Sequence, residues 1–135
     1  MNAPSKPMPD VTDTVTTAFW AATRSERLVV PQCAGCGYQF WPPEAVCPEC
    51  LQSRFAWIDV EPSGTLWSYA TYRRALDPAF ADEVPYVVGL IELASGIKMY
   101  GIMRGEPGDM QIGRDVAAVF EKVTDDVTFV RWRLI

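Results

Sequence analysis

Four cysteines arranged as two C-x2-C pairs constrain the fold of this chain more than any other feature. Ten residues separate the two pairs, which together hold every cysteine of the 135-residue sequence. Two residues between thiolates allow one tight turn to present both sulfur atoms to one ion, and two such turns complete a tetrahedral four-sulfur site. The spacing therefore predicts one zinc ion bound by Cys33, Cys36, Cys47 and Cys50.

Besides free buried thiols, these cysteines have two alternative explanations. Disulfides fit poorly with residues 1–7, which have no apolar segment of the kind found in secretory signals. Iron in a rubredoxin-like electron carrier is the second alternative, but the ten-residue spacer is short for that fold. Four thiolates leave no coordination position for water or substrate, so the ion is expected to be structural and to supply folding energy.

The composition argues against an autonomous enzyme. The chain has no histidine, which removes the commonest general base, and metal binding would leave no cysteine as a nucleophile. The net charge of −5, with 12 scattered basic residues, opposes non-specific binding to nucleic acid or to anionic membranes. No run approaches the roughly 18 apolar residues that a membrane span needs, so a cytoplasmic protein is expected.

The first half of the chain is predicted to hold a flexible tail, a helix and the metal module. Residues 1–12 are rich in proline and offer little to pack. Within the helix-and-ribbon region, residues 13–58, Asp13 is the expected helix N-cap and Phe19 and Ala22 share one helical face. Extended segments should lead into and out of the cysteine module.

The second half, residues 59–135, has a strand pattern. Aromatic and β-branched residues, bounded by turn residues, predict strands over 65–72, 86–93, 97–103, 115–121 and 127–134. Interior glycines at 89 and 101 suggest a closed, strongly curved sheet. A five-stranded barrel of this size is most often an OB-fold, with an SH3-like barrel and a small open sandwich as alternatives.

The order of several motifs resembles the domain-of-unknown-function family 35 proteins. These motifs are Phe19-Trp20, the extended approach Leu28 to Cys33, Phe40-Trp41-Pro42-Pro43, Cys47-Pro48-Glu49-Cys50, the segment 63–68 and Ile112-Gly113-Arg114-Asp115-Val116. The resemblance runs from about residue 14 to the C-terminus and implies a mainly β protein: an N-terminal helix and a rubredoxin-like zinc ribbon followed by a five-stranded OB-fold. It also implies partnership with thiolase-like enzymes, including thiolases and acyl-CoA retro-aldolases, and sometimes with hot-dog-fold hydratases, in which the partner carries the catalytic residues.

Two pairs of residues are candidates for contacts with a partner enzyme or with coenzyme A. Arg73 and Arg74 sit where the first barrel strand should enter a loop, and guanidinium forks suit phosphates or an acidic surface. Phe40 and Trp41 lie between the cysteine pairs, where they either anchor a partner or pack the ribbon against the barrel. The ordinary explanation for Arg73 and Arg74 is a solvated loop, and that for Phe40 and Trp41 is internal packing.

The leading hypothesis is a non-catalytic, zinc-containing accessory subunit. It would form a hetero-oligomer with a thiolase-like acyl-CoA enzyme, stabilise that enzyme and share in acyl-CoA binding. An OB-fold module for single-stranded nucleic acid is an alternative, because Trp67, Tyr69 and Thr71 could stack on bases. The acidic balance disfavours that alternative, and the rubredoxin-like electron carrier remains the other.

Overall fold

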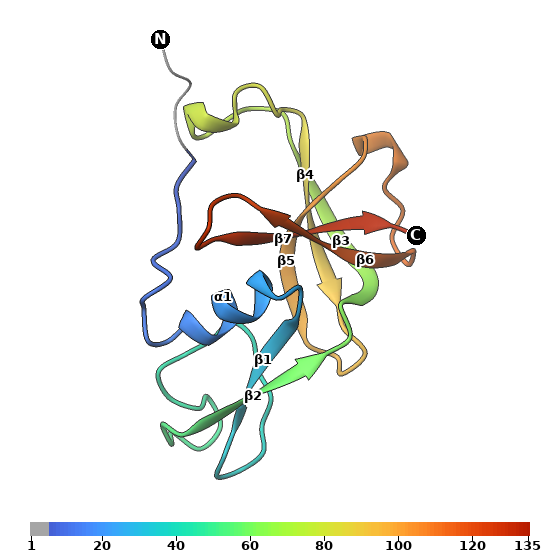
Figure 1. Ribbon diagram of the computed structural model, residues 1–135. Helices are drawn as coiled ribbons and strands as arrows, with labels where there is room; N and C mark the ends of the chain where they lie inside the picture. Colours follow the sequence, from blue (N-terminus) through green and yellow to red (C-terminus); the bar gives the residue numbers. More distant parts are fainter. Residues whose placement is uncertain (1–5) are drawn as a thin grey trace.

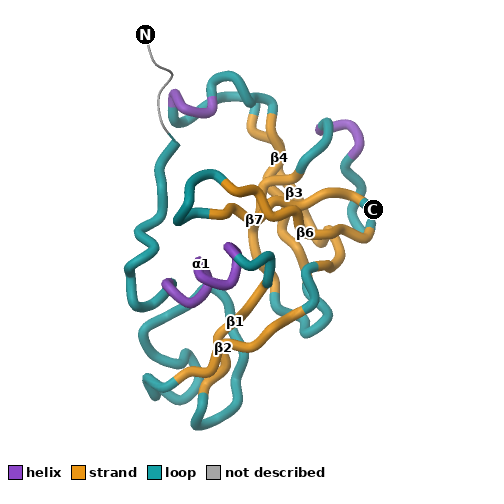
Figure 2. The backbone as a smooth tube through the Cα atoms, viewed as in Figure 1, coloured by secondary structure: helices purple, strands orange, loops and turns teal. Residues whose placement is uncertain are grey.

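The protein is mainly β, with one short α-helix near its N-terminus. The computed structural model describes residues 6–135, so the first five residues of the predicted tail lie outside the described part. The elements are α1 (Thr17–Arg24), β1 (Leu28–Cys33), β2 (Phe55–Val60), β3 (Ser63–Tyr72), the 3-10 turn η1 (Pro78–Phe80), β4 (Tyr86–Glu92), β5 (Lys98–Met103), the 3-10 turn η2 (Pro107–Asp109), β6 (Asp115–Lys122) and β7 (Thr128–Leu134). In Figures 1 and 2, α1, β1 and β2 lie together below a barrel made from the remaining strands.

The five C-terminal strands form a closed barrel in the order β3-β4-β5-β7-β6, and β6 pairs back onto β3. All neighbours are antiparallel except β5 and β7, which are parallel. Closure gives every barrel strand a neighbour on both sides, although β5 and β7 meet at only one residue pair, Met103 opposite Trp132. This topology confirms the predicted five-stranded OB-like barrel and excludes the open sandwich.

Two glycines make room at the centre of the barrel. Gly89 in β4 is the register partner of Gly101 in β5. A Cβ atom at position 89 would meet Met103 and Leu66, and one at position 101 would meet the indole of Trp132. The two glycines therefore admit large core side chains, a role that the sequence-based expectation of bending did not anticipate.

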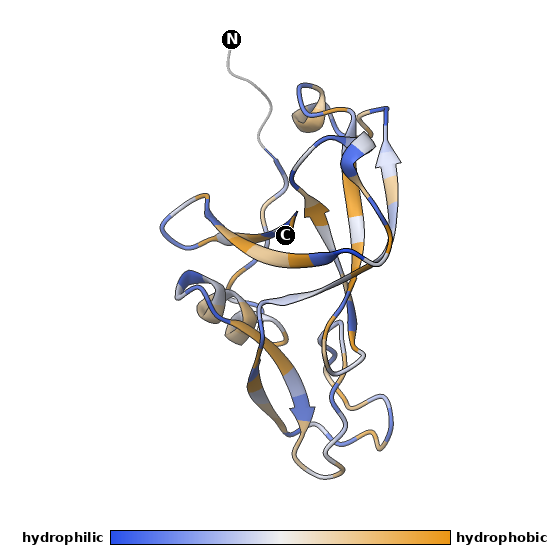
Figure 3. Cartoon of the chain, turned by 90° about the vertical axis from the view of Figure 1, so that its right-hand side faces the viewer, coloured by the Kyte–Doolittle hydropathy of each residue, from blue (hydrophilic) through white to orange (hydrophobic). Residues whose placement is uncertain are grey.

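The ribbon and the barrel share one hydrophobic core. β1 pairs with β2 in an antiparallel register that runs from Leu28 opposite Val60 to Cys33 opposite Phe55, as the predicted extended segments require. Leu28 and Val30 belong to the same buried cluster as Leu66 and Trp132 of the barrel. Figure 3 shows hydrophobic stretches along several strands, alternating with hydrophilic ones, and hydrophilic stretches in several connecting loops. The expected boundary at residues 58 and 59 falls within β2.

The helix begins later than its sequence predicts. We expected Asp13 to cap it, but α1 starts at Thr17, and the N-cap residue Thr16 makes no side-chain cap bond. The Asp13 carboxylate instead accepts a hydrogen bond from the backbone N–H of Val15, 2.8 Å away, in the turn before the helix. Threonine-rich segments are weak helix formers, so this turn competes with the first helical turn. Of the predicted face, Ala22 is buried and Phe19 packs against the core.

Within residues 6–135, no helix is long and apolar enough to cross a membrane.

Candidate metal centre and surrounding surfaces

The fold brings all four cysteines to one point beside the β1–β2 pair. Their sulfur atoms lie within 4.8 Å of one another. The Sγ atoms of Cys33 and Cys50 are 3.4 Å apart, and those of Cys36 and Cys47 are 3.7 Å apart. All four are free thiols, so the disulfide alternative is excluded. The predicted ligands are therefore assembled as the spacing required.

Each cysteine pair sits on a tight turn whose backbone points toward sulfur. The N–H of Cys36 lies 3.5 Å from the Sγ of Cys33, and the N–H of Glu49 lies 3.4 Å from the Sγ of Cys47. The residue after each pair has a positive φ, 77° at Gly37 and 66° at Leu51. The glycine of the first turn thus has a leucine as its counterpart in the second. Such N–H groups favour thiolate over thiol, as a metal site requires.

The geometry and charge of the cluster fit one zinc ion. Zn–S bonds of about 2.3 Å in a tetrahedron place sulfur atoms about 3.8 Å apart, close to the separations observed. The backbone N–H of Cys36 is the main reason that the pKa of Cys33 falls to about 6. The Gln52 amide lowers the pKa of Cys50, but burial and the three neighbouring sulfurs outweigh it and raise that pKa to about 12. Four crowded thiolates repel one another, and a divalent cation at their centre removes that repulsion.

The aromatic step between the cysteine pairs is used mostly for internal packing. Phe40 is only 5% exposed, and its ring centroid lies 5.5 Å from that of Phe55. Trp41 is half-buried, with its ring centroid 4.9 Å from that of Phe19 in α1. Phe40 therefore offers little surface to a partner, whereas part of Trp41 faces outward.

Arg73 and Arg74 follow β3 directly, as predicted, and both are exposed. Neither makes an ion pair or a side-chain hydrogen bond within the described part of the chain. They lie beside Tyr72, whose ring stacks on that of Tyr86 at a centroid distance of 5.1 Å. The two guanidinium groups are therefore available for an external anion.

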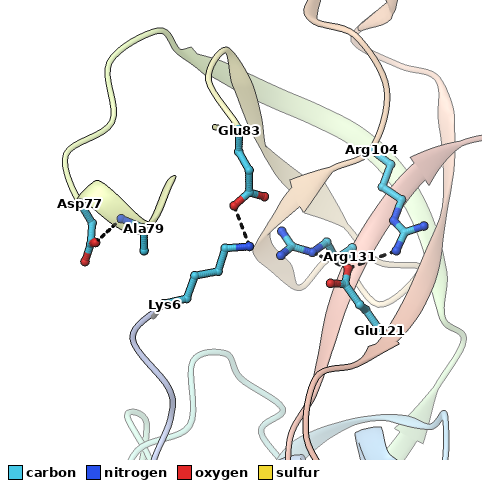
Figure 4. Close-up of polar contacts among 7 residues, drawn as sticks. All are labelled: Lys6, Asp77, Ala79, Glu83, Arg104, Glu121 and Arg131. Carbon is cyan, nitrogen blue, oxygen red and sulfur yellow. Dashed lines mark hydrogen bonds and ion pairs between the residues drawn. The ribbon is translucent and has the colours of Figure 1, made fainter. Parts of the chain in front are cut away.

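An ion cluster that sequence analysis missed lies on β6 and β7. Arg131 is 7% exposed, and its Nε donates to Oε2 of Glu121 at 2.8 Å, while Nη2 of Arg104 donates to the same oxygen at 3.1 Å (Figure 4). Burial alone would raise the pKa of Glu121, but Arg131 and Arg104 outweigh it and lower that pKa. Strand alternation puts Arg131 and Arg133 on the same face of β7, and nothing in the sequence pattern marks only Arg131 as buried.

Two adjoining family models match the chain. Residues 20–56 match the rubredoxin-like zinc ribbon domain of ChsH2, and residues 57–121 match its C-terminal OB-fold domain. A DUF35 domain-containing scaffold protein of Methanocaldococcus jannaschii is 32% identical over 101 residues, which are 73% of this chain and 71% of that protein. The chain belongs to the DUF35 family. The predicted resemblance, the zinc ribbon joined to an OB-fold and the single structural zinc ion are thereby confirmed.

Two further proteins are similar to this chain. One, from Thermomonospora curvata, is named as a probable enoyl-CoA hydratase alpha subunit and is 35% identical over 120 residues, or 86% of this chain. The match spans only 36% of that relative's length. A solved structure described as the Ltp2-ChsH2(DUF35) aldolase superposes with a TM-score of 0.81 at 27% identity, covering 93% of this chain and 98% of the other.

Proposed function

We propose that this DUF35 protein is a non-catalytic scaffold subunit that binds and stabilises a thiolase-like acyl-CoA enzyme, either a thiolase or an acyl-CoA aldolase. The observation that carries the proposal is the likeness, over 93% of this chain, to a DUF35 chain in a structure described as an aldolase. The scaffold name of the Methanocaldococcus jannaschii relative supports the same role. A four-thiolate zinc site has no open position, which supports a structural function for the metal.

The barrel presents an exposed aromatic face that suits such a partner. Trp67, Tyr72 and Tyr100, on β3 and β5, are 51%, 36% and 76% exposed. Leu90 on β4, the strand between β3 and β5, is the register partner of Tyr100 and lies on the same face as these aromatic residues. Large exposed aromatic groups dominate the binding energy of protein interfaces. We take this outer face of β3, β4 and β5 as the surface that contacts the partner enzyme.

A share in acyl-CoA binding is assigned to the loop that follows β3. Arg73 and Arg74 lie at the end of the aromatic face and have no internal partner among the described residues. Coenzyme A carries phosphates, and guanidinium groups bind phosphate with two hydrogen bonds at once. A coenzyme bound at the edge of the interface would contact both subunits. Trp41 remains a candidate partner contact on the ribbon side.

The test is to purify the tagged chain from its native cells and to identify co-purifying proteins by mass spectrometry, with zinc measured on the same sample. A thiolase-like protein at near-equal stoichiometry supports the proposal. Tyr100→Ser should reduce that recovery, whereas Val123→Ser, at an exposed apolar position in the β6–β7 turn, should not. The proposal fails if no acyl-CoA enzyme is recovered. Its non-catalytic part fails if the purified chain alone cleaves or condenses acyl-CoA thioesters.

A further inference from the structure

A half-open groove of about 380 Å³ lies between α1, the outer side of β5 and β7, and the 3-10 turn η1. Its walls are mainly aromatic, and they include Phe19, Trp41, Phe80, Tyr100 and Phe129. The volume is within the range of small-molecule sites, which are typically apolar concavities with a few polar groups that fix the ligand's orientation. The groove is separate from the zinc centre, because none of the four cysteines lines it.

The charged residues that line this groove are both cations. They are Lys6 and Arg131, in a chain whose net charge is −5. Each is already paired with a carboxylate that does not line the groove: Lys6 with Glu83 at 2.6 Å, and Arg131 with Glu121. Figure 4 shows the Lys6 ammonium and the Arg131 guanidinium approaching from opposite sides. The groove therefore combines an apolar wall with two cationic side chains, each of which has a carboxylate partner beyond the lining.

Arg131 has hydrogen-bonding capacity that the described residues leave unused. Its Nε donates to Glu121, but its two terminal nitrogens have no hydrogen-bond partner within residues 6–135. They point away from Glu121 toward the side of Lys6 (Figure 4). No side-chain nitrogen or oxygen in the described chain is both fully buried and unpartnered, so these nitrogens can be reached from outside. Arg131 is 93% buried, yet its two terminal guanidinium nitrogens are unpaired and can be reached from outside. This is unusual, since buried polar groups are normally paired.

We propose that this groove binds a monocarboxylate with an apolar body, with the carboxylate on the terminal nitrogens of Arg131. A guanidinium fork matches the two oxygens of a carboxylate, and the aromatic wall takes the hydrocarbon or aryl portion. Lys6 adds a second cation beside the same end of the groove. The site favours free acids over their thioesters, because a carboxylate offers the guanidinium two anionic acceptor oxygens and a thioester offers one neutral carbonyl oxygen. Every residue of the site comes from this chain, but Trp41 and Tyr100 are also proposed partner contacts, so the site is tested on the chain without a partner.

Binding is tested on the zinc-loaded full chain with decanoate as the probe and 1-decanol as the neutral match. Trp20, Trp41 and Trp132 line the groove, so tryptophan fluorescence reports occupancy. Decanoate should bind saturably below about 1 mM. Decanol should bind at least about tenfold more weakly, because a hydrogen bond to a charged group is lost. Absence of saturation, or equal affinity for the two probes, overturns the proposal.

Two variants separate the fork from general charge. Arg131→Lys keeps the charge but loses the fork, so decanoate should bind about tenfold more weakly. Arg104→Met removes the other cation that contacts Glu121, but Arg104 does not line the groove, so affinity should stay within about twofold. Equal losses in the two variants would contradict the assignment. If Arg131→Lys does not fold, the site is tested in the unaltered protein by nuclear Overhauser contacts of decanoate. Contacts with Phe129 support the site, and contacts only with Trp67 refute it.

Discussion

Gly101 provides the sharpest test of how the barrel core is packed. A methyl group at this position in β5 would overlap the indole of Trp132, which is 1% exposed in the centre of the core. The indole can move only by displacing its neighbours, and overpacking of this kind costs about 1–3 kcal/mol. Alanine also removes conformational freedom from the unfolded chain, which returns about 0.4–1 kcal/mol. We therefore expect Gly101→Ala to lower the free energy of unfolding by about 1–2 kcal/mol.

Gly108 is the matched control, because a Cβ atom there would meet nothing within 4 Å. It lies in the 3-10 turn η2 and has no positive φ. Gly108→Ala should therefore only reduce the conformational entropy of the unfolded chain, which stabilises the protein by up to about 1 kcal/mol. The assay is urea unfolding in zinc-containing buffer. At a slope of about 1–3 kcal/mol per molar urea, the two midpoints should move in opposite directions. A Gly101→Ala midpoint equal to or above that of the unaltered protein would refute the packing argument.

Three further predictions concern the metal, the ion cluster and the partner. Cys36→Ser should lose most of its bound zinc and the fold of the ribbon, and undiminished zinc by elemental analysis would contradict the site. Glu121→Gln should cost about 1–3 kcal/mol in urea unfolding, because Arg131 stays buried without its counter-ion. The pKa of Glu121 is lowered in the folded state, so its stabilisation is present above the ordinary carboxyl pKa and is lost as the pH falls through the lowered value. In the Glu121→Gln protein, the free energy of unfolding should therefore fall less steeply below about pH 5 than in the unaltered protein. An equally steep fall in the two proteins would refute the assignment. Arg73→Ala with Arg74→Ala should weaken binding of coenzyme A to the recovered complex without reducing its assembly, as measured by calorimetry and gel filtration.

The metal centre could be predicted from sequence because its geometry is local. Two residues within each C-x2-C pair set the turn, and Gly37 has the positive φ that the turn needs. Five strands could be located within a few residues, since alternation and turn residues are also local signals. The start of α1 could not, because the Asp13 side chain holds the Val15 N–H in a turn that competes with the first turn of a helix.

The core and the groove were decided by tertiary structure. Strand alternation treats Arg131 and Arg133 alike, yet only Arg131 is buried, with its guanidinium paired with Glu121 of β6 and beside the Phe129 ring. Similarly, no local pattern shows that Leu28 of the ribbon shares a core with Trp132 of the barrel. By itself the sequence determined the ligands of the zinc ion, the strand content and the acidic charge. The tertiary structure decided which side chains meet in the core. Such contacts join residues about a hundred positions apart, and no short segment of sequence contains both partners.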